Sequence, residues 1–221
     1  MSQVYDRVAL IGLGLIASSI FWASKRNGVS GYVAGFSRSK QTRDTAKKIG
    51  LCDEVFDTVE DAVKDADLVI LCVPVGAMEQ VMLDIAPFLK TGATISDVGS
   101  VKRAVIDAVE PHLPTDVKFV PAHPLAGTEH SGPESGFASL FDNRWCLLTD
   151  HGSADKEAQN KVMNFWKSLG ANVEFMDADH HDLVLAVTSH APHLIAYTMV
   201  GVADDLGKVT DSEVIKYSAA G

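Results

Sequence analysis

Two polar segments follow apolar runs in the middle of the chain, and one of them offers a residue suited to proton transfer. Asp97–Lys102 reads DVGSVK, and His123–Glu129 reads HPLAGTE. In an open parallel sheet, ligands bind beyond the carboxyl ends of the strands. His123 is therefore a candidate general base, because imidazole can accept a proton near neutral pH. The alternative is a histidine that is hydrogen-bonded only for structure.

A glycine turn lies close to the N-terminus, where Val8–Ala17 reads VALIGLGLIA. This pattern is a strand that runs into GxGxxA and then a helix. Gly12 permits the tight turn, Gly14 lets the backbone approach a pyrophosphate, and Ala17 allows close helix–strand packing. Exposed N–H groups and the helix dipole favour the anionic diphosphate; the alternative is a turn needed only for packing. The predicted cofactor-binding residues of this turn are Gly12, Gly14, Leu15 and Ile16.

The end of the next strand normally selects between the two nicotinamide dinucleotides. An acidic residue there binds the ribose 2′-hydroxyl of NAD, whereas an arginine accommodates the 2′-phosphate of NADP. The expected acidic position is Ser37, and Arg38 and Ser39 follow it. These groups can bind a phosphate through charge-assisted hydrogen bonds, so NADP is the preferred prediction. Alternatively Arg38 caps or stacks on adenine, and NAD stays usable. Val73 and Pro74, at the end of the predicted strand Leu68–Val73, are also predicted to contact the cofactor.

Four histidines lie in a long helical pattern near the C-terminus. His190 and His193 are three residues apart and share one helix face. That spacing would suit a metal pair, but no nearby carboxylate or cysteine completes a ligand set, so no metal site is predicted. The preferred interpretation is a solvated helix side that faces an anion. His180 and His181 are interpreted as solvated residues or as part of a cap.

Short β-rich runs alternate with helical patterns through residues 1–177. This alternation predicts βαβ units and an α/β fold with a Rossmann-type doubly wound sheet. A segment rich in Gly, Ser and Pro, Pro124–Asn143, is expected to be a functional loop with one helical turn. The predicted strands are Val8–Ile11, Tyr32–Phe36, Glu54–Phe56, Leu68–Val73, Thr94–Ser96, Trp145–Thr149 and Asn172–Phe175, with a further strand end at Phe119–Pro121. The predicted helices are Leu15–Lys25, Lys40–Ile49, Gly76–Leu89, Val101–Val109 and Asp155–Leu169.

The pattern changes at about Ala178. Ala178–Leu206 reads as a long helical stretch that is broken or bent near Pro192. We therefore expect a dinucleotide-binding domain over residues 1–177 and the beginning of an all-helical second domain over residues 178–221. A chain of 221 residues is long enough for one domain and part of a second.

Composition narrows the classes of partner and the cellular location. The formal net charge of −10 disfavours non-specific binding to nucleic acid and binding to an acidic membrane. The cysteines Cys52, Cys72 and Cys146 are odd in number and form no CxxC pair. They favour a reducing, cytoplasmic location over a disulfide framework or a zinc site. The uncharged run Val8–Ser24 resembles a signal peptide, but its two turn glycines and its short length favour a buried strand and helix.

Four segments in this order resemble the prephenate/arogenate (cyclohexadienyl) dehydrogenases of tyrosine biosynthesis: Gly12–Ala17, Asp97–Lys102, His123–Glu129 and Thr188–His193, which reads TSHAPH. The resemblance covers essentially the whole chain. It implies that hydride passes from the hydroxyl-bearing ring carbon of a small anionic cyclohexadiene to NAD(P)⁺. Carbon dioxide then leaves, which gives 4-hydroxyphenylpyruvate or tyrosine. It also implies a homodimer formed through the helical domain.

The resemblance assigns roles to individual residues. His123 accepts a hydrogen bond from the substrate hydroxyl and polarises it, and Ser100 helps to hold the same hydroxyl. His193 is similar to a substrate-binding residue, and His190 is a weaker candidate for that role. Two acidic residues resemble family positions in a polar network at the mouth of the site, and these are Glu129 and Asp182.

Three positions depart from the family pattern or have more than one interpretation. Lys102 either belongs to that polar network or is a solvated charge on the first turn of a helix. Ala191 stands where relatives often have leucine, which slightly enlarges the pocket. The family continues past a glycine-rich turn to an arginine that binds the side-chain carboxylate. The sequence ends at Tyr217–Gly221, so we expect that arginine to lie beyond these residues.

Two other classes of protein fit part of the pattern. Another member of the β-hydroxyacid or imine reductase group would place a lysine on the long helix, but Ala178–Leu206 carries histidines and no lysine. A non-catalytic dinucleotide sensor needs no proton acceptor beside the nicotinamide, so His123 and Ser100 argue against it.

Overall fold

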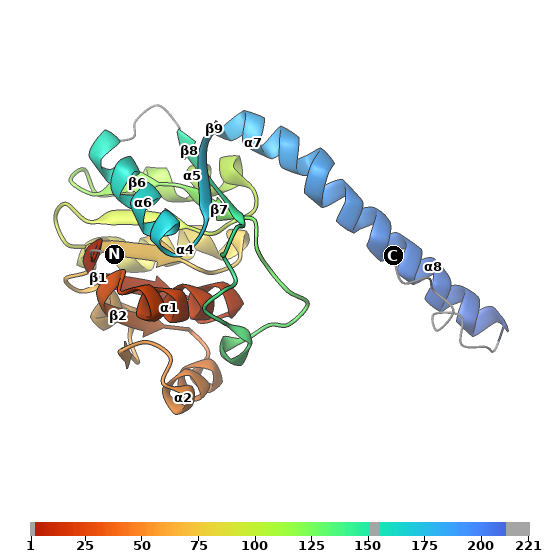
Figure 1. The fold of residues 1–221 in the computed structure, drawn as a ribbon, viewed down its shortest axis with the longest axis horizontal. Coiled ribbons are helices and arrows are strands. Elements are labelled where there is room, and N and C mark those ends of the chain that lie inside the picture. The colour runs from red at the N-terminus through yellow and green to blue at the C-terminus, as the bar shows by residue number, and fades with distance from the viewer. Residues whose placement is uncertain (1–2, 151–154, 211–221) are drawn as a thin grey trace. The chain divides into compact units, whose positions relative to one another are not determined.

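The computed structural model describes residues 3–150 and 155–210. Contacts among the described residues divide the chain into two compact units, one up to Ala178 and one from Asp179 onward. The first unit is built on a parallel six-stranded sheet with helices on both faces (Figure 1). This architecture confirms the predicted Rossmann-type α/β fold.

The strands of the main sheet follow the order β3-β2-β1-β4-β5-β6. The strand order therefore reverses between β1 and β4, and ligands of doubly wound sheets bind at such a switch point. β4 is fully buried along its whole length, as expected for a central parallel strand covered on both faces. The bounds are Tyr5–Ile11 (β1), Ser30–Phe36 (β2), Glu54–Val55 (β3), Leu68–Leu71 (β4), Thr94–Asp97 (β5) and Lys118–Val120 (β6).

Two hydrophobic clusters cover the two faces of this sheet. Along β1, Val8 and Leu10 belong to one cluster, while Ala9 and Ile11 belong to the other. Successive side chains of a strand point to opposite faces, so both faces of β1 are packed. The helices of this part are α1 (Leu15–Asn27), α2 (Lys40–Ile49), α3 (Val59–Val63), α4 (Met78–Ile85) and α5 (Lys102–Val109), with short 3₁₀ turns η1 (Val75–Ala77), η2 (Ala86–Phe88) and η3 (Glu110–His112).

Two elements differ from the sequence-based prediction. The single helix predicted over Gly76–Leu89 is divided into η1, α4 and η2, and Pro87 lies in η2. Proline has no backbone N–H with which to continue the α-helical ladder. The short α3 was not predicted; the side chain of Thr58 caps it by accepting the N–H of Asp61 at 3.2 Å.

A second, three-stranded sheet follows, with the order β7-β8-β9. The sequence predicted one strand end at Phe119–Pro121, but β6 and β7 belong to different sheets and separate at Pro121. Proline cannot donate to a strand ladder, which explains the break. The bounds are Ala122–Pro124 (β7), Trp145–Asp150 (β8) and Asn172–Asp177 (β9), and α6 (Lys156–Ser168) connects β8 to β9.

The long loop between β7 and β8 is fixed against α1. It contains the expected helical turn, η4 (Pro133–Ser135). A Cβ added at Gly136 would overlap the side chain of Ser18, so the two backbones approach closely there. The N–H of Phe137 donates to the Ser19 hydroxyl at 3.2 Å. The loop therefore lies along the helix that begins at the glycine turn.

The second unit is helical over its described residues. A π-helical segment, η5 (Ala186–His190), separates α7 (Ala178–Leu185) from α8 (Ala191–Thr210). The irregularity expected near Pro192 is this segment, in which Ala191 donates to the carbonyl of Ala186. Ala178–Val209 is long and apolar enough to cross a membrane by length and composition alone, since it contains an 18-residue window with a mean hydropathy of 1.4. A single helix of this kind is weak evidence for a membrane span.

Candidate functional site

The turn after β1 can be made only by glycine at its first position. Gly12 has a φ of +98°, and its N–H donates to the Phe36 carbonyl at 2.8 Å. A Cβ on Gly12 would lie 2.5 Å from the carbonyl oxygen of Cys72 and 2.8 Å from Cγ1 of Val73. Positive φ and this crowding both require the absence of a side chain. The predicted cofactor residue Val73 therefore lies directly beside the turn.

Gly14 meets a different environment, and the difference points to a ligand. A Cβ on Gly14 would have no protein atom within 4 Å, so protein packing does not explain a glycine here. Gly14 is also the N-cap of α1, and without a side chain it cannot cap the first N–H groups of the helix. The first N–H groups of α1, at Leu15 and Ile16, have no partner within the helix, and such a helix N-terminus favours an anion. The residues present fit a dinucleotide diphosphate, while the packing-only alternative accounts for Gly12 and not for Gly14.

Arg43, on α2, organises the segment that follows β2. Its Nη1 donates to the carbonyl oxygens of Ser37 at 2.8 Å and Arg38 at 3.1 Å, and its Nε donates to Asp57 at 3.1 Å. Hydrogen bonds from Lys47 and then from Arg43 hold the pKa of the Asp57 carboxyl below its usual value. Arg43 was not predicted from the sequence, because nothing near a cation on an exposed helix indicates that it binds the carbonyls of Ser37 and Arg38.

The three residues predicted to select the cofactor have different environments. The Ser39 hydroxyl accepts the N–H of Thr42 at 3.3 Å and caps α2, so its oxygen already has one partner. Arg38 is exposed, and its guanidinium makes no hydrogen bond or ion pair with the residues that the structure describes. Ser37 is partly buried beside it. Arg38 is therefore able to bind an incoming phosphate.

The DVGSVK segment begins at the end of β5 with a buried ion pair. The side chains of Asp97 and Lys102 are both 0% exposed, and Asp97 Oδ2 lies 2.5 Å from Lys102 Nζ. The same carboxylate oxygen accepts the N–H of Gly99 at 2.7 Å. The interpretation of Lys102 as a solvated charge is wrong, because its ammonium is bound inside the protein. Ser100, between these residues, is exposed.

The HPLAGTE segment joins the same ion pair through β7. Lys102 Nζ donates to the carbonyl of Ala122 at 2.6 Å, and the N–H of Ala122 donates to Asp97 Oδ1 at 3.1 Å. His123 comes next; it is 9% exposed and pairs with Leu147 of β8. The fold thus brings together two segments that are separated in the sequence, as predicted from the strand ends.

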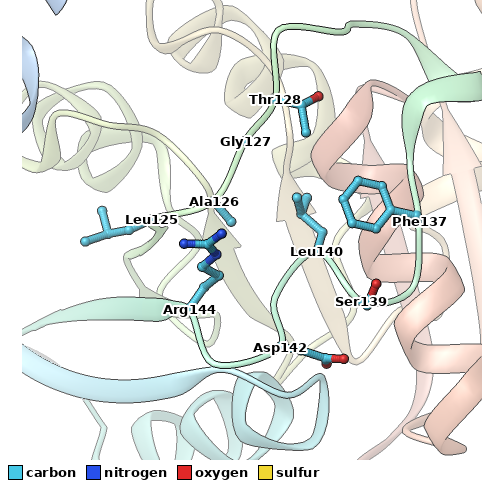
Figure 2. A pocket seen from close by; sticks show the side chains of 9 residues that line it. All are labelled: Leu125, Ala126, Gly127, Thr128, Phe137, Ser139, Leu140, Asp142 and Arg144. Carbon is cyan, nitrogen blue, oxygen red and sulfur yellow. The ribbon is translucent and has the colours of Figure 1, made fainter. Parts of the chain in front are cut away.

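A cavity lies beside the segment that follows His123 (Figure 2). Its volume is about 310 Å³. The Arg144 side chain extends toward Ala126 (Figure 2). Arg26 donates to the carboxylate of Asp142 at 2.7 Å and 3.1 Å. The cavity itself was not predicted, although all of its lining residues except Arg144 lie within Pro124–Asn143, the loop expected to be functional. Its lining residues are Leu125, Ala126, Gly127, Thr128, Phe137, Ser139, Leu140, Asp142 and Arg144.

Glu129 lies on the exposed part of the loop after β7. Its side chain is 83% exposed, and Oε1 lies 3.3 Å from Nε2 of His130. This position leaves the carboxylate accessible to a ligand, and its place in a substrate network remains a prediction.

The other predicted substrate-binding residues belong to the second unit. Nδ1 of His193 lies 2.7 Å from the carbonyl oxygen of Ser189, so that nitrogen carries the hydrogen and Nε2 is left to contact a ligand. Asp182 Oδ1 lies 2.8 Å from Nδ1 of His181. His181 is fully buried, so its interpretation as a solvated residue is wrong. The roles of His190, His193 and Asp182 stay predictions.

The cysteines are not suited to nucleophilic or ligand chemistry. All three are free, and burial raises the pKa of the Cys52 thiol to about 12. Burial also raises the pKa of Cys72 and of Cys146 well above the usual range. A neutral thiol is a poor nucleophile and a poor metal ligand. Among the residues that the structure describes, no group of three or more His, Cys, Asp or Glu side chains could hold a metal ion.

The strand order, the open glycine turn and the joined polar segments define a dinucleotide-binding protein of the Rossmann class. A family model described as "Prephenate dehydrogenase, nucleotide-binding domain" matches residues 22–175. A second, described as "Prephenate dehydrogenase, dimerization domain", matches residues 177–221. The chain belongs to the prephenate dehydrogenase family.

Individual relatives agree with this assignment. The chain is 43% identical over 216 residues to a cyclohexadienyl dehydrogenase of Zymomonas mobilis, covering 98% of this chain and 73% of the relative. It is 35% identical to a prephenate dehydrogenase of Bacillus subtilis, covering 90% of this chain and 54% of the relative. The crystal structure of prephenate dehydrogenase from A. aeolicus, in complex with hydroxyphenyl propionate and NAD⁺, is 29% identical with a TM-score of 0.87, covering 100% of this chain and 76% of that one. The chain thus spans about half to three quarters of these relatives.

Proposed function

We propose that the protein catalyses the oxidative decarboxylation of prephenate, arogenate or both in tyrosine biosynthesis, with NADP⁺ as the preferred hydride acceptor. One observation carries the proposal. The DVGSVK and HPLAGTE segments meet at the carboxyl edge of a Rossmann sheet whose glycine turn is open at Gly14. The names of the relatives, cyclohexadienyl and prephenate dehydrogenase, support the same reaction.

A nicotinamide dinucleotide, when bound, supplies the acceptor for the hydride of the hydroxyl-bearing ring carbon. His123 accepts the proton of that hydroxyl as the hydride leaves. Ser100 donates a hydrogen bond that holds the hydroxyl oxygen in place. The bond to the ring carboxylate then breaks, carbon dioxide leaves, and the electron pair of that bond completes the aromatic ring. The resulting phenolic oxygen recovers a proton, so atoms and charge balance.

Substrate binding and dimer formation involve residues of the second unit. An anionic substrate meets a chain with a net charge of −10, so it needs local cations or hydrogen-bond donors. We infer that His193 supplies one such group, with His190 beside it and Asp182 and Glu129 in the surrounding network. We also infer a homodimer formed through the second unit, because α8 exposes many apolar side chains and the second unit matches a dimerization-domain model. The free cysteines favour a cytoplasmic location for it.

A steady-state assay with both substrates and both cofactors tests the proposal. The full-length protein should reduce the cofactor and release carbon dioxide in equal amounts from prephenate, arogenate or both. Cofactor binding without turnover of either substrate would favour the dinucleotide-sensor alternative. Turnover of a simple β-hydroxyacid or an imine, with neither cyclohexadiene consumed, would favour the wider reductase group.

Arg38→Ala tests the cofactor preference. A guanidinium that binds the 2′-phosphate contributes about 1.5–3 kcal/mol to the binding free energy, so NADP⁺ should bind about 10- to 150-fold more weakly while NAD⁺ changes little. The measurement is the Kd of each cofactor by calorimetry. Lys40→Ala is a matched control, because Lys40 is exposed and paired with Asp44 at 2.7 Å. Equal losses for both cofactors would retract the preference for NADP.

A further inference from the structure

The backbone of Ala122, the residue before His123, is held through both its N–H and its carbonyl by one buried ion pair. The N–H of Ala122 donates to Asp97 Oδ1 at 3.1 Å, and its carbonyl accepts from Lys102 Nζ at 2.6 Å. Asp97 and Lys102 are joined to each other at 2.5 Å. All three residues are 0% exposed. The contact is therefore made entirely inside the protein.

We infer that Asp97 and Lys102 position His123 for proton transfer, and this inference rests on the proposed function of His123. The two side chains fix the orientation of the backbone from which the imidazole projects. The backbone of His123 is also held, because it pairs with Leu147 of β8. The Asp97–Lys102 pair acts through this backbone and is a positioning pair, not a group that touches the substrate.

The sheet topology explains why such a link is needed. β7, which carries His123, pairs with β8 in the three-stranded sheet. The glycine turn follows β1 of the six-stranded sheet. No strand ladder connects β7 to β5, its neighbour at this edge, within the described residues. Asp97, at the end of β5, and Lys102, at the start of α5, therefore connect the strand of the proton acceptor to the sheet that carries the cofactor turn.

The environment of Lys102 argues against a direct role in binding substrate. An ammonium has three donors, and at least two of them are taken by Asp97 and Ala122. Its side chain is 0% exposed, so a soluble anion cannot reach it without a change in the fold. A buried ion pair is also not the most stable way to fill this space, since apolar replacements often stabilise as well or better. The hydrogen bonds to Ala122 explain the presence of this ion pair better than a contribution to stability does.

The expected effect follows from the geometry of hydride transfer. Reacting groups must lie about 3–3.5 Å apart, and a displacement of about 1 Å can lower the rate about 100-fold. Loss of the positioning pair should therefore lower kcat about 100-fold. The Kd of the cofactor should change less than about threefold, because Gly12, Gly14 and Arg38 are untouched.

The test uses the double variant Asp97→Asn/Lys102→Met in the full-length protein. This change removes both charges together, so no unpaired buried charge is left, and the Ala122 carbonyl loses its ammonium donor. The matched control is Asp67→Asn/Lys90→Met. That pair, joined at 2.6 Å, also ties a carboxylate to a strand backbone, through the N–H of Arg7 at 3.0 Å.

Two readouts separate positioning from stability. The double variant should keep the wild-type circular dichroism spectrum and cofactor Kd, with kcat about 100-fold lower and KM little changed; the control should keep its kcat. Amide hydrogen exchange at Ala122 and His123 should become faster in the double variant only. A folded double variant with a kcat within threefold of wild type, or with unchanged exchange at both amides, would overturn the inference. If the wild-type protein turns over neither substrate, the proposed function fails, and the exchange rates still decide whether the pair holds the backbone.

Discussion

Replacing His123 with asparagine should lower turnover about 10²- to 10⁴-fold, the range for loss of a general base. Asparagine cannot accept the hydroxyl proton, but it can occupy the same place in β7. The contacts that hold this strand do not involve the imidazole, so they should persist. His123 pairs with Leu147 through its backbone, and the Ala122 backbone is held by the side chains of Asp97 and Lys102. The measurement is kcat at saturating substrate and cofactor, with the melting temperature recorded beside it.

His112→Asn provides the control for this variant. Nε2 of His112 lies 3.4 Å from Glu79 on the exposed side of the first unit, and we expect no change in kcat. A His123→Asn protein that folds and turns over at the wild-type rate would remove His123 from the proton-transfer role.

The single substitution Lys102→Met should destabilise the protein by about 3–5 kcal/mol, the range for breaking one partner of a buried ion pair. Methionine fills nearly the same space as the lysine stem, so little of the loss should come from a cavity. The cost arises because the Asp97 carboxylate stays buried at 0% exposure without its ammonium partner. The free energy of unfolding, measured by denaturant titration, gives the result.

Lys90→Met separates this effect from the ordinary loss of a surface pair. Lys90 and Asp67 are 46% and 21% exposed, and solvent screening should limit the loss to about 1 kcal/mol or less. Adding Asp97→Asn to Lys102→Met should recover part of the stability, since the unpaired charge is gone. A loss below about 1 kcal/mol for Lys102→Met alone would contradict the buried ion pair.

Much of the fold follows from local sequence. The alternation of apolar runs with helical patterns gave the order of most strands and helices, because burial on both faces of a parallel sheet leaves a strong periodic signal. The glycine turn could also be predicted from the sequence. Gly12 needs a positive φ, Gly14 leaves the backbone open to a ligand, and both requirements act within a few residues.

The interior of the site was less accessible to prediction. Lys102 reads as a surface charge at the start of a helix, and only the contact with the Ala122 carbonyl, 20 residues away, shows that it is buried. The cavity beside Arg144 likewise requires residues 125–128 and 137–144 to fold against each other. β6 and β7 separate at Pro121, and the sequence alone does not show that the strands on its two sides belong to different sheets. Long-range contacts of this kind have no signature in a short window of sequence.

The most direct test of the proposed hydride transfer follows the hydrogen atom on the hydroxyl-bearing ring carbon. Prephenate and arogenate carrying deuterium at the hydroxyl-bearing ring carbon are incubated with the full-length protein and NADP⁺, and the reduced cofactor is analysed by mass spectrometry. We predict that the label from at least one substrate is recovered in the reduced cofactor, with one carbon dioxide released for each hydride transferred, and that His123→Asn slows both events together. Label retained in the ring product, or carbon dioxide released without reduced cofactor, would contradict it.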